Sequence, residues 1–444
     1  MPVPDDTMIK NPIYFSLPRQ FYLFQGGIIF GYFALRLMVL GTSWWCLAKT
    51  HSTVALGSVI SASVLLELLA VPLAAPLGDR FGAKLIKVTF AIQALCLFML
   101  ASAALFLKTF SLVAVVPLLV ISQLADAARD PLADSLLPQL IGNDALVDGE
   151  RVRRALGTLS RILGPVVGGA VTAMMGPSIT LYLAAAALVV GGYMCMASGA
   201  GRPRARAQVG ATSRKSSGWV RELAHGFLSV IAIRTELAIA FGNSFLTVAV
   251  STFMLIALPQ LAQETLGAWV MGAVDGAFGC GVFVAATLVV KPLNGRFGRY
   301  GTVVLGLLMH VAAFVVLFAC ARVVPLVVAG GFALGFASVL VATNLTALRL
   351  QATPPDYRTR VIANTMFISS IFLPGALYVA GWVARGWGSG ALLGSLFTCA
   401  LVATLIIPFA PHLRNLLGKD KQEGASDYAA LFPKAFGNHS WSES

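Results

Sequence analysis

Charged side chains interrupt several long apolar stretches of this sequence. A charge costs free energy to bury in apolar surroundings, so such a residue is a candidate for ligand binding or proton transfer. An arginine keeps its charge and can hold an anion, whereas a buried carboxyl group can take up and release a proton. The candidates are Arg36, Glu67, Asp126, Arg129, Asp130, Arg161 and Asp275.

Five of these residues are predicted to form a binding and proton-transfer site. We expect Arg36, in "YFALRLMVLG", and Arg129, in "QLADAARDPLAD", to bind an anionic or hydrogen-bonding compound. Asp126 or Glu67 would carry a proton, and Asp275 is either a proton carrier or a hydrogen-bonded core residue. A structural explanation stays open for each, because opposite charges on neighbouring turns can pair and hold helices together.

Uncharged polar residues in the later apolar stretches have two possible roles. Hydrogen bonding between helices is the simpler explanation for them. Three asparagines are nevertheless included among the binding candidates: Asn243, Asn344 and Asn364.

The composition indicates a protein embedded in lipid. Hydrophobic residues make up 57% of the 444 residues and charged residues 11%, and the mean hydropathy is +0.81. A soluble domain carries roughly 25% charged residues. Continuous apolar runs of about twenty residues predict transmembrane helices rather than a barrel. Twelve are expected, at 21–47, 54–77, 85–107, 111–137, 156–176, 178–198, 236–259, 268–290, 301–321, 324–348, 362–384 and 389–410.

The distribution of lysine and arginine predicts the orientation of the chain. Alternate connecting segments carry most of these residues, and the connections between them carry one each, at Lys49, Lys108, Arg322 and Arg385. The positive-inside rule places the basic segments and both termini on the cytoplasmic side of a bacterial inner membrane. The net charge of +13 is then explained by contact with anionic lipid, and a nucleic-acid partner is not expected.

Other chemistries lack their usual sequence patterns. The six cysteines show no metal-ligand spacing. Neither a nucleotide-binding loop nor a nucleophile elbow is found, so we expect no cofactor, no metal and no enzyme activity.

Two short patterns occur twice, about half the chain apart. "PLGDRFG" at 76–82 is repeated as "PLNGRFG" at 292–298, and Arg151 precedes Pro165 by the spacing that separates Arg360 from Pro374. These duplications predict two six-helix halves, at 21–198 and 236–410. The remaining segments are predicted as cytoplasmic: a leader at 1–20, a basic linker with an amphipathic helix at 199–235, and a disordered tail at 411–444.

The first copy resembles a known family signature. "APLGDRFGAK" is similar to the loop signature of the major facilitator superfamily, Gly-x-x-x-Asp-Arg-x-Gly-Arg-Lys/Arg, although Ala75 and Ala83 depart from it. The matching residues are Asp79, Arg80, Gly82 and Lys84. The resemblance implies an all-α membrane protein of twelve transmembrane helices in two pseudo-symmetric six-helix bundles. It also implies that helices one, four, seven and ten line a central cavity.

A second motif refines the resemblance. "SRILGPVVGG" is similar to the Gly-Pro-x-x-Gly-Gly motif associated with exporters, and "THSTVALG", "LLPQLIGNDAL" and "LQATPPDYRTRV" resemble the enterobactin-exporter and macrolide-efflux branch. In this family the loop with this signature holds one side of the transporter closed. A simple turn in a positively charged loop would also explain the signature. We expect conformational gating by Asp79, Arg80, Gly82, Arg161, Gly164, Pro165, Gly168 and Gly169, the last three glycines approaching helix eight.

These observations predict a secondary active transporter. The favoured function is proton-coupled export of a small polar or anionic metabolite, such as a siderophore, by a monomeric antiporter in contact with lipid. The main alternative is a multidrug or macrolide efflux pump. An importer, a lipid flippase and a non-transporting assembly or sensor protein on the same scaffold are less favoured.

Overall fold

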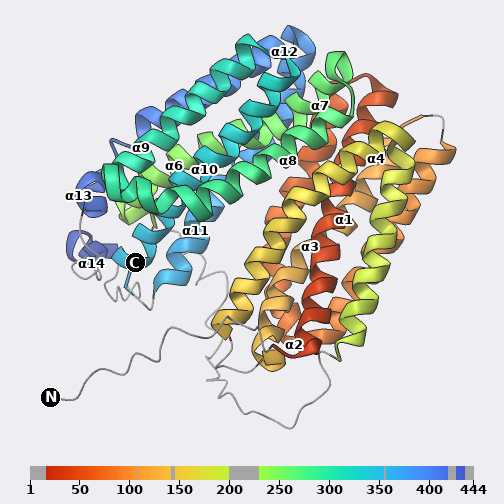
Figure 1. Ribbon diagram of the computed structural model, residues 1–444, viewed down its shortest axis with the longest axis horizontal. Coiled ribbons are helices and arrows are strands. Elements are labelled where there is room, and N and C mark those ends of the chain that lie inside the picture. Colours follow the sequence, from red (N-terminus) through yellow and green to blue (C-terminus); the bar gives the residue numbers. More distant parts are fainter. Residues whose placement is uncertain are drawn as a thin grey trace, which may run out of the picture.

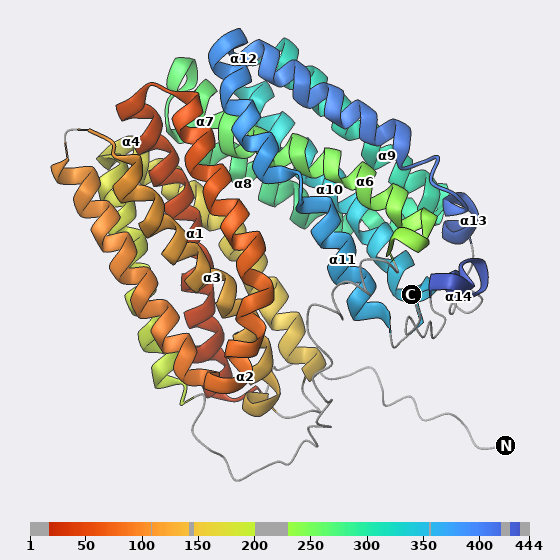
Figure 2. The same ribbon diagram turned by 180° about the vertical axis from the view of Figure 1, so that it is seen from behind.

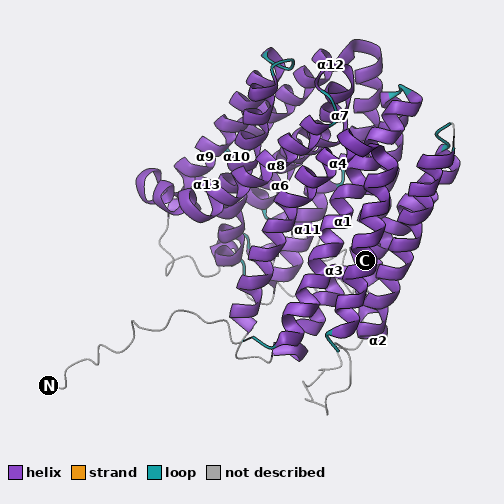
Figure 3. Ribbon diagram, turned by 45° about the vertical axis from the view of Figure 1, so that its right-hand side comes forward, coloured by secondary structure: helices purple, strands orange, loops and turns teal. Residues whose placement is uncertain are grey.

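The computed structural model describes residues 17–107, 109–141, 146–199, 230–354, 357–418 and 427–435. Within these ranges every regular element is a helix (Figure 3). Some side chains inside the helices, including those of residues 70–84, lie outside the described part of the structure.

Four long helices form the N-terminal half. They are α1 (Arg19–Thr50), α2 (Thr53–Phe106), α3 (Leu112–Ile141) and α4 (Leu146–Ala197). The first connection is short because His51 takes a left-handed conformation at the end of α1, and the Ser52 side chain accepts a hydrogen bond from the Ala55 N–H at the start of α2. Helix α2 covers the predicted second and third spans, and α4 covers the fifth and sixth.

The C-terminal half begins with a span that changes its helical winding twice. It runs through α6 (Arg234–Thr252), a π-helical turn (Phe253–Ala257), α7 (Leu258–Leu261) and a second π-helical turn (Ala262–Leu266). The rest comprises α8 (Trp269–Val284) with a π-helical end (Ala285–Val289), α9 (Val290–Ala319), α10 (Val324–Ala352), α11 (Arg358–Ser370) and α12 (Leu373–Ile406).

Three glycines fold long helical runs back on themselves. Gly176, Gly298 and Gly388 have φ of 84°, 71° and 80° with ψ near 170°, a region that is essentially open to glycine alone. The runs Trp269–Ala319 and Asn364–Ile406 are 51 and 43 residues long, and each therefore supplies two membrane spans. Gly298 ends the second copy of the repeated phrase, which therefore contains a turn. Gly82 of the first copy lies among the residues that are not fully described.

The helices form two bundles side by side (Figures 1 and 2). In the N-terminal bundle α1 packs on α4 and α2 on α3, and in the other bundle α10 packs on α8 and α9. The bundles converge at the end that carries α7 and separate toward the end that carries α13 (Leu413–Gly418) and α14 (Asp427–Leu431). The predicted fold class, twelve spans in two helical bundles, is confirmed.

Glycines bring the two bundles into close contact at the convergent end. A Cβ atom at Gly169 of α4 would lie 2.5 Å from the Cα of Gly272 in α8, so neither residue leaves room for a side chain. This confirms the predicted approach to the eighth helix for Gly169, whereas Gly164 and Gly168 lie against α1 instead. The second contact joins α2 to α12, where Thr53 Oγ1 donates a 2.8 Å hydrogen bond to the Gly381 carbonyl and Ser61 Oγ a 2.6 Å bond to the Pro374 carbonyl.

The C-terminal tail departs from the predicted disorder. Tyr428 in α14 is completely buried, and its hydroxyl donates a 2.7 Å hydrogen bond to Glu236 Oε1 at the start of α6. Arg349 of α10 forms a 2.7 Å ion pair with the other oxygen of the same carboxylate. Residues 427–435 are ordered because the tyrosine and neighbouring apolar side chains pack on the ends of the helices, which a polar composition does not reveal.

Candidate functional site

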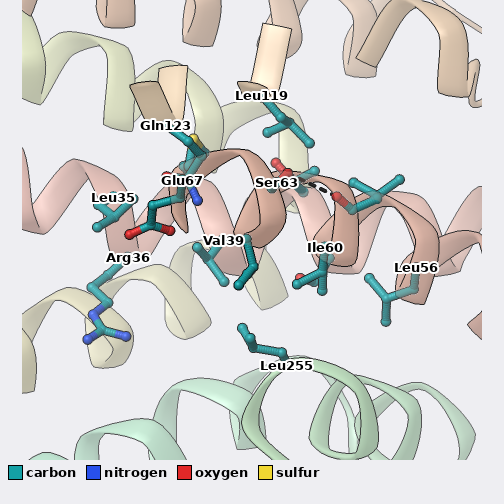
Figure 4. Close-up of a pocket in the computed structure, with 15 residues that line it drawn as sticks. Leu35, Arg36, Val39, Leu56, Ile60, Ser63, Glu67, Leu119, Gln123 and Leu255 are labelled. Carbon is teal, nitrogen blue, oxygen red and sulfur yellow. Dashed lines mark hydrogen bonds between the residues drawn. The ribbon is translucent and has the colours of Figure 1, made fainter. Parts of the chain in front are cut away.

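A cavity opens between α1, α2 and α3, with one residue from the other bundle (Figure 4). Its volume is about 210 Å³, and most of its wall is aliphatic. Arg36 from α1 and Glu67 from α2 are its charged residues, and Leu255 in the first π-helical turn closes it from the C-terminal half. The chain therefore places two predicted site residues on one cavity.

A second cavity of about 220 Å³ continues across the boundary between the bundles. Arg36 lines it from α1, and Asp275 and Phe278 line it from α8. The two cavities share Arg36, Val39, Ser43 and Leu255. We refer to them as the first lobe, which contains Glu67, and the second lobe, which contains Asp275.

Arg36 lies where the two lobes meet. Its side chain extends away from the Glu67 carboxylate (Figure 4), and its positive charge acts on the Asp275 carboxylate. No hydrogen bond and no ion pair within 4 Å joins Arg36 to any other described residue. Gly164 of the exporter-like motif makes room for it, because a Cβ there would lie 3.0 Å from the Arg36 Cβ. The aliphatic stem of Arg36 is thus held by packing on α4, and its guanidinium donors remain available to a bound molecule.

Arg129 occupies a very different environment. Its side chain is 1% exposed and forms a 2.8 Å ion pair with Asp126 Oδ1. It also donates to Gln93 Oε1, lies 4.2 Å from the centre of the Phe90 ring, and fills the space left by Gly31. Arg129 lines neither lobe, so in this conformation the structure places it in the packing of the N-terminal bundle rather than beside Arg36.

Asp126 connects this buried cluster with the first lobe. It accepts a hydrogen bond from Gln93 Nε2 at 3.4 Å in addition to the Arg129 ion pair. Asp126 and Glu67 carry like charges that act on each other. Glu67 faces the cavity directly, whereas Asp126 lies behind it.

The predicted asparagines lie away from both lobes. Asn344 is buried and accepts a 2.9 Å hydrogen bond from Asn294 Nδ2 of the repeated phrase, while its own Nδ2 donates to the Leu340 carbonyl. Asn364 is buried and Asn243 half-buried, and neither lines either lobe. For Asn344 the structure shows the interhelical bonding that was the simpler explanation.

Two further residues of the cavity wall could be found from their helical spacing, although no motif includes them. Val39 and Ser43 follow Arg36 at spacings of three and seven, which place all three on one face of α1. The contribution of Leu255 depends on the π-helical turn, for which the sequence offers no signal that we recognise. Such turns are frequent at functional sites.

The exporter-like motif lies against two other helices. Gly164 and Gly168 face Arg36 and Leu40 of α1, and Gly169 faces Gly272 of α8. The side chains of Asp79, Arg80 and Arg161 lie outside the described part, as does Gly82. No group of three His, Cys, Asp or Glu residues that could hold a metal ion occurs in the chain as described.

Helical runs long enough to cross a membrane are arranged as two bundles around a charged cavity, as in multi-pass membrane transporters. The model of the Major Facilitator Superfamily matches residues 26–363, which is more than half of the chain. The chain belongs to this superfamily.

Individual relatives are distant. The uncharacterized MFS-type transporter YvqJ of Bacillus subtilis (strain 168) is 20% identical over 281 residues, which cover 63% of this chain and 65% of that relative. The crystal structure of the peptide transporter POT in complex with sulfate has a TM-score of 0.69 at 15% identity and covers 92% of this chain and 97% of that chain. The crystal structure of the nucleoside transporter NupG has a TM-score of 0.66 at 13% identity, and the match covers 91% of this chain and 100% of that chain. At these identities the solved structures show the shared fold alone.

Proposed function

We propose that this protein is a proton-coupled antiporter that exports a small polar or anionic organic compound, such as a siderophore-like metabolite. The observation that carries the proposal is Arg36, a cationic side chain at the junction of the two bundles that has no hydrogen bond or ion pair with any described residue. Glu67 and Asp275 line the lobes on either side of it. Arg36 would hold the anionic group of the substrate, and the two carboxyl groups would exchange protons.

The proposed direction of transport follows from the sequence. The basic connecting segments assign the termini to the cytoplasm, and the Gly-Pro-x-x-Gly-Gly motif favours export. The bundles converge at the end opposite α13 and α14, so this conformation would face the cytoplasm and be ready to load. We infer a monomer in the bacterial inner membrane.

Alternating access would require the convergent contacts to open. Gly169 with Gly272, and Gly57 with Gly381, would form the surfaces on which the bundles rock. Pro165 would hold the bend in α4, and Asp79, Arg80, Gly82 and Arg161 would stabilise the opposite, outward-facing state. Asp126, held by Arg129, would tune proton exchange at Glu67.

A multidrug or macrolide efflux pump is the second candidate. The mostly aliphatic walls of both lobes favour it, since lipophilic compounds need little more than apolar surface to bind. The two candidates differ in whether binding depends on the charge of Arg36.

Two experiments test the proposal. Cells without the gene should retain the exported compound and release less of it to the medium, as measured by mass spectrometry. A drug pump would instead alter resistance to several unrelated lipophilic compounds. When a pH gradient is imposed across liposomes that contain the protein, the identified compound should move in the direction opposite to proton flow. An unchanged rate after the gradient is collapsed would contradict proton coupling.

A further inference from the structure

The two lobes meet at one charged side chain, and each has room for a ring. An apolar cavity of roughly 150 Å³ is enough to bind benzene in a protein interior. The first and second lobes measure about 210 and 220 Å³. A ligand that filled both would therefore span the junction formed by Arg36, Val39, Ser43 and Leu255.

Each lobe is lined mainly by aliphatic side chains. The first contains Leu56, Val59, Ile60, Val64 and Leu119, and the second contains Val250, Met254, Leu258, Met271 and Phe278. Such walls gain free energy by removing apolar surface of a ligand from water. The parts of the ligand that enter the lobes must be largely apolar.

The junction itself favours an anion. A guanidinium has five N–H donors and stays charged, and no described residue accepts a hydrogen bond from Arg36. Glu67 and Asp275 lie in separate lobes, and a carboxyl group among apolar side chains can lose its charge by taking up a proton. Arg36 is thus the one of these three groups whose charge is permanent.

We propose that the ligand is an amphipathic organic anion whose acid group lies between two apolar arms, each about one ring in size. The acid group binds Arg36, one arm enters the first lobe, and the other arm enters the second. The inference rests on the proposed transport function, because it takes the ligand of this cavity to be the transported compound. It narrows "polar or anionic" to a two-armed amphipath.

Diphenylacetate is a suitable probe because its carboxylate lies between two phenyl rings. Its binding to the purified full-length chain is measured by calorimetry in detergent, with empty micelles as the blank. Phenylacetate lacks one arm, and diphenylmethylamine has the same arms with the opposite charge. We expect diphenylacetate to bind at least tenfold more tightly than either. If phenylacetate binds with equal affinity, the ligand does not need two arms, and the proposal is overturned. If the amine binds with equal affinity, the site does not select an anion, and the proposal is likewise overturned.

Variants locate the probe in the cavity. Arg36→Gln should weaken diphenylacetate binding at least tenfold and remove the preference over the amine, whereas Arg36→Lys should retain part of it. Arg385→Gln is the matched control, because Arg385 lies beside Trp382 and lines neither lobe. An equal effect of the Arg36→Gln and Arg385→Gln substitutions would contradict the assignment.

Filling each lobe separately tests the placement of the arms. Ile60→Phe reduces the first lobe and Ser251→Phe the second. Each should weaken diphenylacetate binding more than phenylacetate binding, and a reduction confined to one variant would overturn the two-lobed arrangement. The assay contains no pH gradient. If diphenylacetate binds as expected but the protein shows no gradient-driven transport, only the proposed function is contradicted. If the protein transports a compound but diphenylacetate does not bind as expected, only the proposed ligand class is contradicted.

Discussion

Arg36 and Arg129 are both arginines within apolar helices of the same bundle, yet their surroundings differ in every respect. Arg129 is buried against an aspartate, a glutamine and a phenylalanine ring. Arg36 faces two lobes of a cavity and pairs with no described side chain. An arginine within a membrane-spanning helix thus indicates an important position, and its neighbours determine whether it stabilises the fold or is available to a ligand.

The largest effect that separates the two arginines should be on stability. Replacement of Arg129 by glutamine removes the ion pair that this buried side chain forms with the carboxylate of Asp126. Breaking a buried pair on one side costs about 3–5 kcal/mol. Thermal and denaturant unfolding of the purified protein should show this loss for Arg129→Gln and less than about 1 kcal/mol for Arg36→Gln.

A reversed order of these two values would contradict the comparison. Arg129→Gln combined with Asp126→Asn provides a check, because the double variant removes both charges of this ion pair. It should recover part of the stability that the single substitution loses.

Two glycine substitutions sharpen the contrast with a smaller expected effect. A Cβ at Gly31 would collide with the guanidinium of Arg129, which cannot move without losing its partners. A Cβ at Gly164 would press on the aliphatic stem of Arg36, whose guanidinium is free to shift. Gly31→Ala should therefore lower the free energy of unfolding by about 1–3 kcal/mol, as overpacking does. Gly164→Ala should mainly lower the affinity for diphenylacetate.

Gly375→Ala is the matched control for both substitutions. Nothing lies within 4 Å of a Cβ at this position, which belongs to α12. It should leave stability unchanged or raise it by about 0.5–1 kcal/mol through the lower flexibility of the unfolded chain. Comparable losses at all three glycines would mean that helix geometry, rather than contact with either arginine, accounts for the effects.

A third arginine provides the smallest expected change. Arg349 shares the Glu236 carboxylate with the hydroxyl of Tyr428 in the ordered tail. Removing that hydroxyl in Tyr428→Phe leaves the ion pair intact and should cost about 1.5 kcal/mol, in the range for a hydrogen bond to a charged group. Proteolysis of the tail under native conditions should become faster, and unchanged cleavage would show that the tail is held by apolar packing alone.

The same tyrosine predicts a pH dependence. Burial and the negative charge of Glu236 raise the pKa of Tyr428 well above its ordinary value near 10, although Arg349 opposes the shift. Because the folded state favours the protonated phenol, the contribution to stability is complete below pH 10 and is lost as the pH rises above 10. Tail proteolysis should accelerate in that range for the natural chain and not for Tyr428→Phe.

The sequence predicted the architecture more successfully than the local roles of residues. Apolar run lengths and the repeated phrase indicated the twelve spans and two bundles, since these patterns depend on local composition. The packing of Arg129 required knowledge of Gln93, Phe90 and Gly31, which lie on other helices far away in the sequence. The order of the tail likewise depends on Glu236, nearly two hundred residues before Tyr428.

Accessibility of the cavity tests the central claim most directly. In a chain whose six cysteines are replaced by alanine, Val39→Cys places one thiol in the wall shared by both lobes. A membrane-impermeant maleimide is then added to either face of sealed vesicles, with and without diphenylacetate. The account predicts modification from the face that carries α13 and α14, and protection by the probe. Equal modification from both faces, or modification that the probe leaves unchanged, would contradict it.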